Sequence, residues 1–223
     1  MSNRHKDLVT AIDDGVAQLA QSLPDGASAR LATLLAELQR WGARSNLTAI
    51  REPAAMVAGH VLDSLAVRPF VTGQRLIDVG TGAGFPGLPL AIAEPQLAVE
   101  LLDASAKKVA FIRHIIGELG LDNVRAVQSR AESYAPSERF DTVVVRALGA
   151  LPNLLEIAGH LVGERGALLA LKGQYPHDEL LELSRMNRLA SCWAYRVSAL
   201  TVPGLENHAR HVVMLERRPG VPT

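Results

Sequence analysis

From Gly73 onward, short apolar runs alternate with helical stretches, and this alternation restricts the fold more than any other feature of the sequence. The runs are nearly continuous in apolar residues, as expected of strands that helices cover on both faces. They span residues 76–80, 99–103, 124–128, 141–145 and 167–171. The pattern predicts an α/β protein with a parallel, doubly wound sheet.

One stretch between these runs is clearly helical. Over residues 105–119, one stripe at helical spacing is formed by Val109, Ile112, Ile116 and Leu119. We therefore expect a helix here that packs its apolar stripe against the sheet.

The end of the chain carries two longer apolar segments, residues 192–201 and 208–217, after a helix near residues 177–189. Pro203 and Asn207 lie between the two segments, so we expect an antiparallel hairpin. Five parallel strands closed by such a hairpin are typical of the Rossmann-like class I methyltransferase fold rather than of dehydrogenases.

The chain before the first strand has helical signals and almost no strand signals. We expect a first helix that stops at residues 24–26, a second that runs to about Arg44, and a third from Pro53 to about Val67. This predicts an N-terminal helical extension over residues 1–72 and a methyltransferase-like domain over residues 73–223.

Composition restricts the partners. The 23 basic and 23 acidic residues cancel, which argues against binding nucleic acid through bulk positive charge, so any such site must be local. The single cysteine, Cys192, excludes an internal disulfide and Cys-pair metal motifs, and we expect no metal. No secretory signal and no apolar run of about 20 residues is present. We expect a cytoplasmic monomer without membrane contact.

The strongest motif is DVGTGAGFPG at residues 78–87, directly after the first strand. Its glycines Gly80, Gly82 and Gly84 allow a sharp turn and a close approach of a ligand to the backbone. A rival interpretation exists, because Gly82, Gly84 and Gly87 also match the dinucleotide fingerprint.

Two residues favour S-adenosylmethionine over a dinucleotide. The carboxylate of Asp78 suits a ligand with an ammonium group and would repel a pyrophosphate. Pro86 removes one N–H donor from the first helical turn, where a phosphate would need every donor.

Three further strand ends carry candidate ligand contacts. Asp103 could accept from both ribose hydroxyls, with Ser105 as the helix cap, although Asp103 itself could be the cap. Glu132 could accept from the adenine amino group, or form a simple ion pair with Arg130. Arg146 ends a buried strand, where a charge is costly unless it is paired or functional.

Two sequence features that the chain lacks restrict which atom could accept a methyl group. The fourth strand is followed by Ala147 and Leu148 and not by the Asn/Asp-Pro-Pro-aromatic turn of enzymes that methylate exocyclic amines. Cys192, in the late hairpin, is far from the place of a nucleophile. Guanine N7 has a free lone pair and needs mainly alignment, so a site without an evident general base fits it.

At these motifs, and at NLT (46–48), HVLDS (60–64), QSRAE (128–132) and LKG (171–173), the sequence resembles the bacterial small-subunit rRNA methyltransferase G family, formerly called glucose-inhibited division protein B. The resemblance covers most of the chain. It implies N7 methylation of a guanine in the 530 loop of 16S rRNA, on the RNA or the small ribosomal subunit. It also implies cofactor contacts at Gly80, Phe85, Ala131, Glu132 and Arg146.

Roles for the remaining polar residues are hypotheses. Arg146 and Lys172 follow the fourth and fifth strands, so both should lie at one side of the cleft and act in binding rather than in proton transfer. Arg130 and Lys172 are candidate RNA contacts, although Lys172 could instead form a salt bridge at the rim. His60 and Asp63 could be an acid–base pair, but we favour a helix contact that supports the glycine loop.

Two other functions stay open. One is an S-adenosylmethionine-dependent methyltransferase for a protein or a small molecule, which the neutral charge would suit. The other is a nucleotide-sensing module with the same fold and no chemistry. Transfer of a methyl group to a defined RNA would exclude both.

Overall fold

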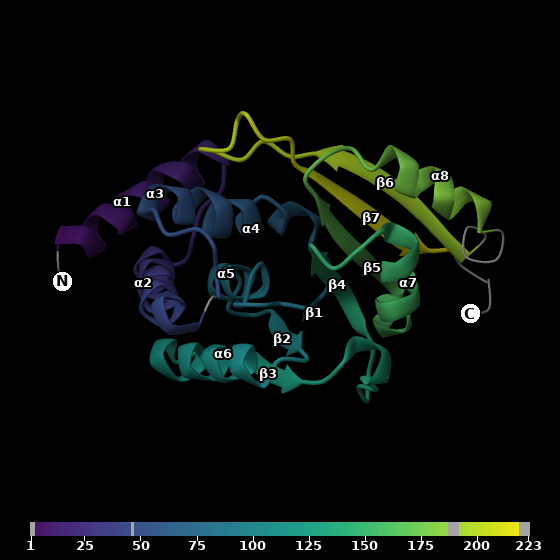
Figure 1. The fold of residues 1–223 in the computed structure, drawn as a ribbon, viewed down its shortest axis with the longest axis horizontal. Helices are drawn as coiled ribbons and strands as arrows, with labels where there is room; N and C mark the ends of the chain where they lie inside the picture. Colours follow the sequence, from purple (N-terminus) through teal and green to yellow (C-terminus); the bar gives the residue numbers. More distant parts are fainter. Residues whose placement is uncertain (1–2, 46, 187–191, 219–223) are drawn as a thin grey trace.

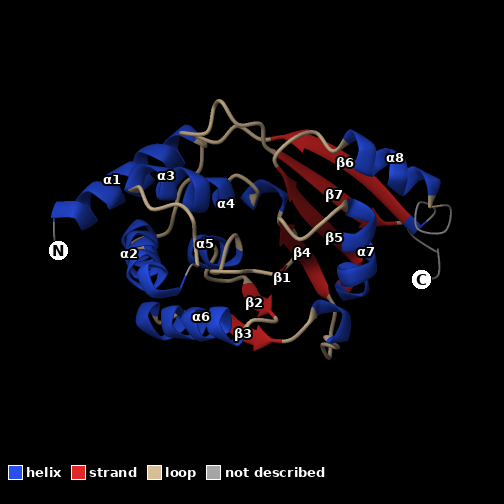
Figure 2. Ribbon diagram, viewed as in Figure 1, coloured by secondary structure: helices blue, strands red, loops and turns tan. Residues whose placement is uncertain are grey.

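Seven strands form one mixed sheet in the order β3-β2-β1-β4-β5-β7-β6 in the computed structural model, which describes residues 3–45, 47–186 and 192–218 (Figures 1 and 2). The strands are β1 (Arg75–Val79), β2 (Ala98–Asp103), β3 (Val124–Gln128), β4 (Phe140–Arg146), β5 (Val162–Lys172), β6 (Trp193–Ala199) and β7 (His211–Arg217). The first five are parallel, and β7 pairs antiparallel with both β5 and β6. The predicted parallel sheet and closing hairpin are confirmed, with β7 inserted between β5 and β6.

The strand order reverses between β1 and β4. From β1 the chain adds β2 and β3 on one side, and then returns to place β4 on the other side of β1. In open parallel sheets, ligands bind at the carboxyl ends of the strands where the order reverses. A ligand site is therefore expected among the residues that directly follow β1 and β4.

Helices cover both faces of the sheet (Figure 2). One face packs against α7 (Leu151–Ala158) and α8 (His177–Arg185). The other packs against α5 (Gly87–Ala93), α6 (Ala106–Leu119) and the N-terminal helices α1 (Asn3–Gln18) and α2 (Ala27–Ser45). The leucine stripe of α2 is fully buried in the same core as the sheet. The N-terminal helices thus share a core with the rest, while a boundary between 72 and 73 stays a prediction.

The third predicted helix is continuous but changes its winding. It begins as α3 (Pro53–Met56), where Glu52 caps the first turn, widens into the π-helical segment η1 (Val57–Leu62), and ends as α4 (Asp63–Leu65). Short π segments in α-helices are frequent at functional sites. This one carries His60 and delivers Asp63 to the carboxyl edge of the sheet.

The α6 stripe is wider than predicted. Phe111 and Ile115 are fully buried, whereas the predicted Ile116 and Leu119 are only half-buried. The reason is that α6 packs on α2 as well as on the sheet, with Trp41 of α2 at 5.5 Å from the Phe111 ring centroid.

The predicted helix over residues 177–189 ends at Arg185 as α8, and residues 187–189 lie outside the described residues. Within the part of the chain that the structure describes, we find no helix long and apolar enough to cross a membrane.

Candidate active site

The glycine loop that follows β1 has a backbone that its glycines alone adopt without strain. Gly80, Gly82 and Gly84 have φ values of +69°, +64° and +93°. Side chains with a Cβ are disfavoured in this left-handed region. A Cβ at Gly82 would meet nothing within 4 Å, so the loop leaves open space beside its backbone.

Asp78 fixes this loop from inside. Its Oδ2 accepts hydrogen bonds from the Thr81 hydroxyl at 2.6 Å and from the Gly87 N–H at 2.8 Å. Burial raises the pKa of Asp78 to about 6, although these two bonds act in the opposite direction. Its other oxygen, Oδ1, is buried with no hydrogen-bond partner among the described residues.

Asp103, at the end of β2, joins the glycine loop to α6. Its Oδ2 accepts from the Gly82 N–H at 3.0 Å and lies 3.2 Å from Lys108 Nζ, and its Oδ1 accepts from the Ser105 N–H at 2.8 Å. Ser105 occupies the N-cap position that the sequence predicts, but its hydroxyl makes no capping bond. Asp103 is 7% exposed, so it is fixed before any ligand arrives.

The predicted adenine contacts lie in the short 3₁₀ helix η3 (Ala131–Ser133), after β3. Ala131 is buried, and Glu132 is exposed. In the residues that the structure describes, Glu132 forms no ion pair with Arg130, so the simpler interpretation of these two residues has no support.

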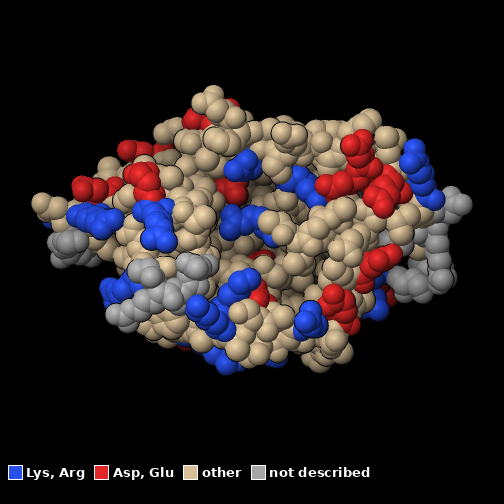
Figure 3. Space-filling view, in the orientation of Figure 1, with Lys and Arg blue, Asp and Glu red and all other residues tan. Residues whose placement is uncertain are grey.

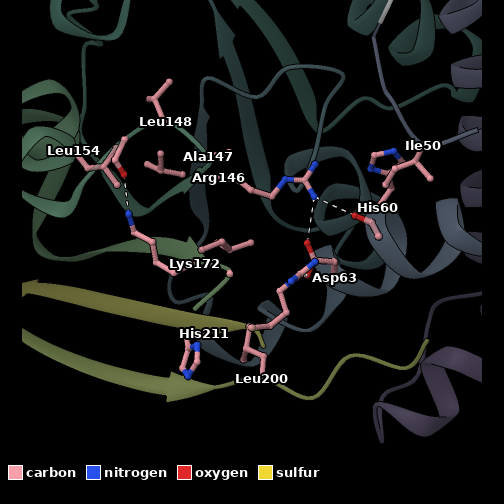
Figure 4. Close-up of a pocket in the computed structure, with 16 residues that line it drawn as sticks. Ile50, His60, Asp63, Arg146, Ala147, Leu148, Leu154, Lys172, Leu200 and His211 are labelled. Atoms are coloured by element: carbon pink, nitrogen blue, oxygen red, sulfur yellow. Dashed lines mark hydrogen bonds and ion pairs between the residues drawn. The ribbon is translucent and has the colours of Figure 1, made fainter. Parts of the chain in front are cut away.

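Arg146, at the end of β4, is paired. Its Nη1 lies 3.3 Å from Asp63 Oδ2 and 3.3 Å from the Gly59 carbonyl oxygen (Figure 4). Arg210 reaches the same carboxylate, with Nε at 2.9 Å from Asp63 Oδ1. The buried carboxylate of Asp63 thus binds two arginines beside the carboxyl end of β4. Sequence reasoning missed Arg210, which has no motif of its own.

His60 supports the glycine loop. Its ring stacks on Phe85 with centroids 4.7 Å apart, and its Nε2 is 2.8 Å from the Thr48 hydroxyl. Burial, with a smaller contribution from Arg146, lowers the pKa of His60 to about 4, so the ring is neutral at physiological pH. His60 thus supports the glycine loop, as the favoured hypothesis describes, but it does so through Phe85. The helix contact with Asp63 is not formed in the described residues, because Asp63 pairs with two arginines.

Lys172, at the end of β5, forms the salt bridge that the sequence left as an alternative. Its Nζ lies 2.7 Å from Glu179 Oε2 and donates to the Gly149 carbonyl oxygen at 2.7 Å. The same Glu179 oxygen accepts from the Leu151 N–H at 2.7 Å. Lys172 thus joins the loop after β4 to α8.

A cavity of about 540 Å³ opens at this edge of the sheet. Both Arg146 and Lys172 line it, as predicted, together with Asp63, Arg210 and the loop after β4 (Figure 4). The other predicted site residues do not line it; these are Gly80, Gly82, Gly84, Phe85, Asp103, Arg130, Ala131 and Glu132.

Leu148 separates the cavity from the glycine loop. A Cβ at Gly80 would lie 2.9 Å from Leu148 Cδ1, so the Leu148 side chain covers Gly80. Ala147, just before it, has φ +56°, an unfavourable conformation for a residue with a Cβ. The site thus has two adjacent parts, a glycine-lined cradle and an arginine-lined cavity, with Arg146 and Leu148 between them.

Comparison with known proteins gives one consistent family. Residues 27–213 match the family model described as rRNA small subunit methyltransferase G. The chain is 43% identical to "Ribosomal RNA small subunit methyltransferase G" of Nitrosospira multiformis, over 93% of this chain and 97% of that protein. It is 45% identical to the protein of that name from Alkalilimnicola ehrlichii, over 92% and 91%.

A solved structure is similar in fold. The SAM-dependent methyltransferase from Aquifex aeolicus superposes with a TM-score of 0.56, over 77% of this chain and 97% of that one. Its sequence is 20% identical, so the likeness concerns the fold. It agrees with the class I methyltransferase fold predicted from the sequence.

Proposed function

The chain belongs to the rRNA small subunit methyltransferase G family, and on this premise we propose that it transfers a methyl group from S-adenosylmethionine to N7 of a guanine in 16S rRNA. The observation that carries the proposal is the pair of adjacent sites at the β1–β4 switch point, which meet at Arg146. One part suits a nucleoside cofactor, and the other suits an anionic acceptor with a flat base.

The cradle fits the cofactor at an atom that has no other partner. Asp78 Oδ1 is a buried acceptor without a donor among the described residues, and the ammonium group of S-adenosylmethionine could donate to it. Asp103 would accept from the ribose hydroxyls, and Glu132 from the adenine amino group, with Ala131 beside the ring. Arg146 would hold the carboxylate of the methionine end.

When bound, the cofactor supplies a methyl group on a positively charged sulfur. The chain's own residues then have to orient the acceptor, since guanine N7 carries a lone pair and no proton to remove. Arg210, or Arg146 where it does not hold the cofactor carboxylate, can donate to guanine O6 or to a phosphate while N7 stays free. Leu148 and Leu154 line the cavity, and their apolar side chains would exclude water from a bound acceptor.

Proton transfer is not required of any residue in the cavity. Asp63 is engaged by two arginines, and His60 is a neutral ring engaged by Thr48 and Phe85. Lys172, a candidate for both catalysis and RNA binding, would position the loop after β4. Arg130 stays a candidate RNA contact, exposed at the far end of the cradle.

The test is methyl transfer from labelled S-adenosylmethionine to 16S rRNA, or to 30S subunits, from a strain that lacks the family enzyme. We expect label at N7 of one guanine, in the 530 loop that the family resemblance implies. Label in a protein or a small molecule, with none in RNA, would support the second candidate function instead. A monomeric state and a cytoplasmic location stay predictions.

Calorimetry separates the two nucleotide interpretations. We expect S-adenosylmethionine or its demethylated product to bind and NAD not to bind, because Asp78 lies under the glycine loop, where a pyrophosphate would have to approach. Tight binding of NAD would contradict the proposal.

A further inference from the structure

Two further hollows lie on the N-terminal helices, next to the arginine-lined cavity. A second hollow, of about 270 Å³, lies between α2 and residues 47–51, and it shares Ile50 with the cavity. A third, of about 570 Å³, lies between α1 and α2 and shares Arg4 and Gln39 with the second. We call the second and third hollows together the N-terminal groove. These shared lining residues place the three hollows one after another, from the cavity to α1 and α2.

Arginines line this groove along its length. Arg51 and Arg4 line the second hollow, and Arg4 and Arg40 the third, all three with exposed side chains. Arg4 and Arg51 have no ion-pair partner within residues 3–45, 47–186 and 192–218. In Figure 3, blue side chains lie around the central hollow, and further blue side chains lie beside red ones over the N-terminal helices at the left of the view.

Of the three arginines in the groove, only Arg40 is paired with an acidic residue in the part of the chain that the structure describes. Glu37 is nearly fully buried, and its carboxylate is engaged by Arg40 at 3.0 Å and by His114 at 2.9 Å. Glu118 lines the third hollow, and it lines neither the second hollow nor the cavity. The stretch between the cavity and Arg4 therefore presents unpaired positive charge.

The groove has fixed walls. Gln39 of α2 donates to the Arg51 carbonyl oxygen at 2.9 Å, and His5 of α1 lies 3.2 Å from the Thr33 hydroxyl of α2. Thr48, in the wall of the second hollow, contacts His60 beside the cavity. The backbone segments that carry these arginines thus have set positions relative to the place where the acceptor base would lie.

We propose that the RNA strand that carries the acceptor guanine leaves the cavity across Ile50 and lies along the N-terminal groove, where Arg51 and Arg4 each bind a phosphate. The proposal rests on the proposed function, because it takes the acceptor to be RNA. It assigns the N-terminal helices a role in substrate binding, and it explains how a chain of zero net charge engages a polyanion. Phosphate contacts contribute affinity and position, and not base recognition.

The test compares two double variants with the same change of net charge. The groove variant is Arg4→Gln with Arg51→Gln. The control variant is Lys6→Gln with Arg30→Gln, which alters exposed basic residues of α1 and α2 that line neither hollow. Methyl transfer to 16S rRNA or 30S subunits is measured for each against salt concentration.

We expect the groove variant to raise KM for RNA several-fold, with kcat and the KM for S-adenosylmethionine unchanged. The slope of log K against log salt should become shallower by about 1.4, at about 0.7 for each lost single-strand phosphate contact. The control variant should match the parent protein in both respects.

Equal effects of the two variants would show a response to bulk charge and would overturn the groove. An unchanged KM and slope for the groove variant would also overturn it, with the parent still methylating RNA. If the parent protein methylates no RNA, the proposed function fails first, so the two failures are distinct. Thermal unfolding of all variants checks that the fold is intact.

Discussion

Asp63 holds the guanidinium of Arg146 at 3.3 Å, across 83 positions of the chain. Asp63 comes from the start of α4 and Arg146 from the end of β4, so the contact exists only when the N-terminal helices lie against the sheet. Its other oxygen binds Arg210 at 2.9 Å. The two arginines of the cavity are therefore positioned by a residue of the helical extension.

Asp63→Ala tests this arrangement. We expect a loss of about 2 kcal/mol in the free energy of unfolding, the scale of hydrogen bonds to charged groups, and a fall in turnover because both arginines lose their anchor. Urea unfolding and the methyl-transfer assay measure the two effects. Asp63→Asn keeps an acceptor and should lose less of both. Full activity of the alanine variant would show that the arginines are positioned by other contacts.

Much of the fold could be predicted from the sequence because it follows from local patterns. Apolar runs, helical stripes and the glycine loop each depend on neighbouring residues, and all five parallel strands lie where these patterns put them. β5 is longer than predicted because its first half, with Glu164 and Arg165 exposed, has no apolar run. Val162 nevertheless pairs with Phe140 across an irregularity in the register.

The contacts of the site could not be predicted in the same way. Arg210 joins the cavity through Asp63, 147 positions earlier, and no local pattern reports such a contact. The sequence placed Arg146 and Lys172 at one edge, since both end parallel strands, but not their partners. Whether Lys172 is free or paired depends on Glu179, which α8 brings back over the loop.

Asp103→Ala should weaken the binding of S-adenosylmethionine by about 1.5 to 3 kcal/mol, because it removes a charged acceptor and frees the Gly82 N–H. Titration calorimetry measures the affinity. The matched control is Ser105→Ala, since the Ser105 hydroxyl makes no capping bond, and we expect its affinity to be unchanged. Equal affinities for both variants, with intact folds, would reduce Asp103 to a role in starting α6.

Lys172→Ala should lower turnover without moving the pH profile of the reaction. Lys172 donates to the Gly149 carbonyl oxygen and pairs with Glu179, so its removal loosens the loop between the cradle and the cavity. Glu179→Gln is the control: it removes the ion pair, keeps an acceptor for the Leu151 N–H, and should lose less activity. Loss of a basic limb from the profile of Lys172→Ala would instead place Lys172 in proton transfer, and an acceptor that loses a proton would replace guanine N7.

His60 should make stability fall in acid. Its pKa is lowered from 6.5 to about 4 in the folded protein, mainly by burial, so the unfolded chain takes up the proton first as the pH falls. The neutral His60 ring therefore contributes up to about 3 kcal/mol to the free energy of unfolding above pH 6.5, and this contribution is lost as the pH falls toward 4. His60→Phe keeps a ring over Phe85 and cannot titrate. The stability of the parent relative to this variant should therefore decline between pH 7 and pH 4, as measured by urea unfolding; a constant difference would contradict burial of the neutral ring.

Asp78 should act in the opposite direction. Its pKa is raised from 3.8 to about 6 in the folded protein, chiefly by burial. As the pH rises, the unfolded chain therefore loses the proton first. The contribution of Asp78 to the free energy of unfolding is fully present below pH 3.8 and is lost as the pH rises through 6. Asp78→Asn removes the charge while its carbonyl oxygen still accepts from Thr81 and Gly87. Between pH 4 and pH 8, the free energy of unfolding of this variant should rise by up to about 3 kcal/mol relative to that of the parent. Urea unfolding at each pH measures it.

The same variant separates the two oxygens of Asp78. In this variant the amide oxygen takes the place of Oδ2, so the glycine loop should keep its conformation. The amide NH₂ takes the place of Oδ1, and it cannot accept a hydrogen bond from an ammonium group. We therefore expect Asp78→Asn to be folded and stable at pH 8 and yet to bind S-adenosylmethionine at least tenfold more weakly in calorimetry. S-Adenosylhomocysteine, which has the same ammonium group and no sulfonium charge, should lose affinity by the same factor. A loss confined to S-adenosylmethionine would mean that Asp78 responds to the sulfonium, and an unchanged affinity for both ligands would leave the carboxylate as a structural support of the loop alone.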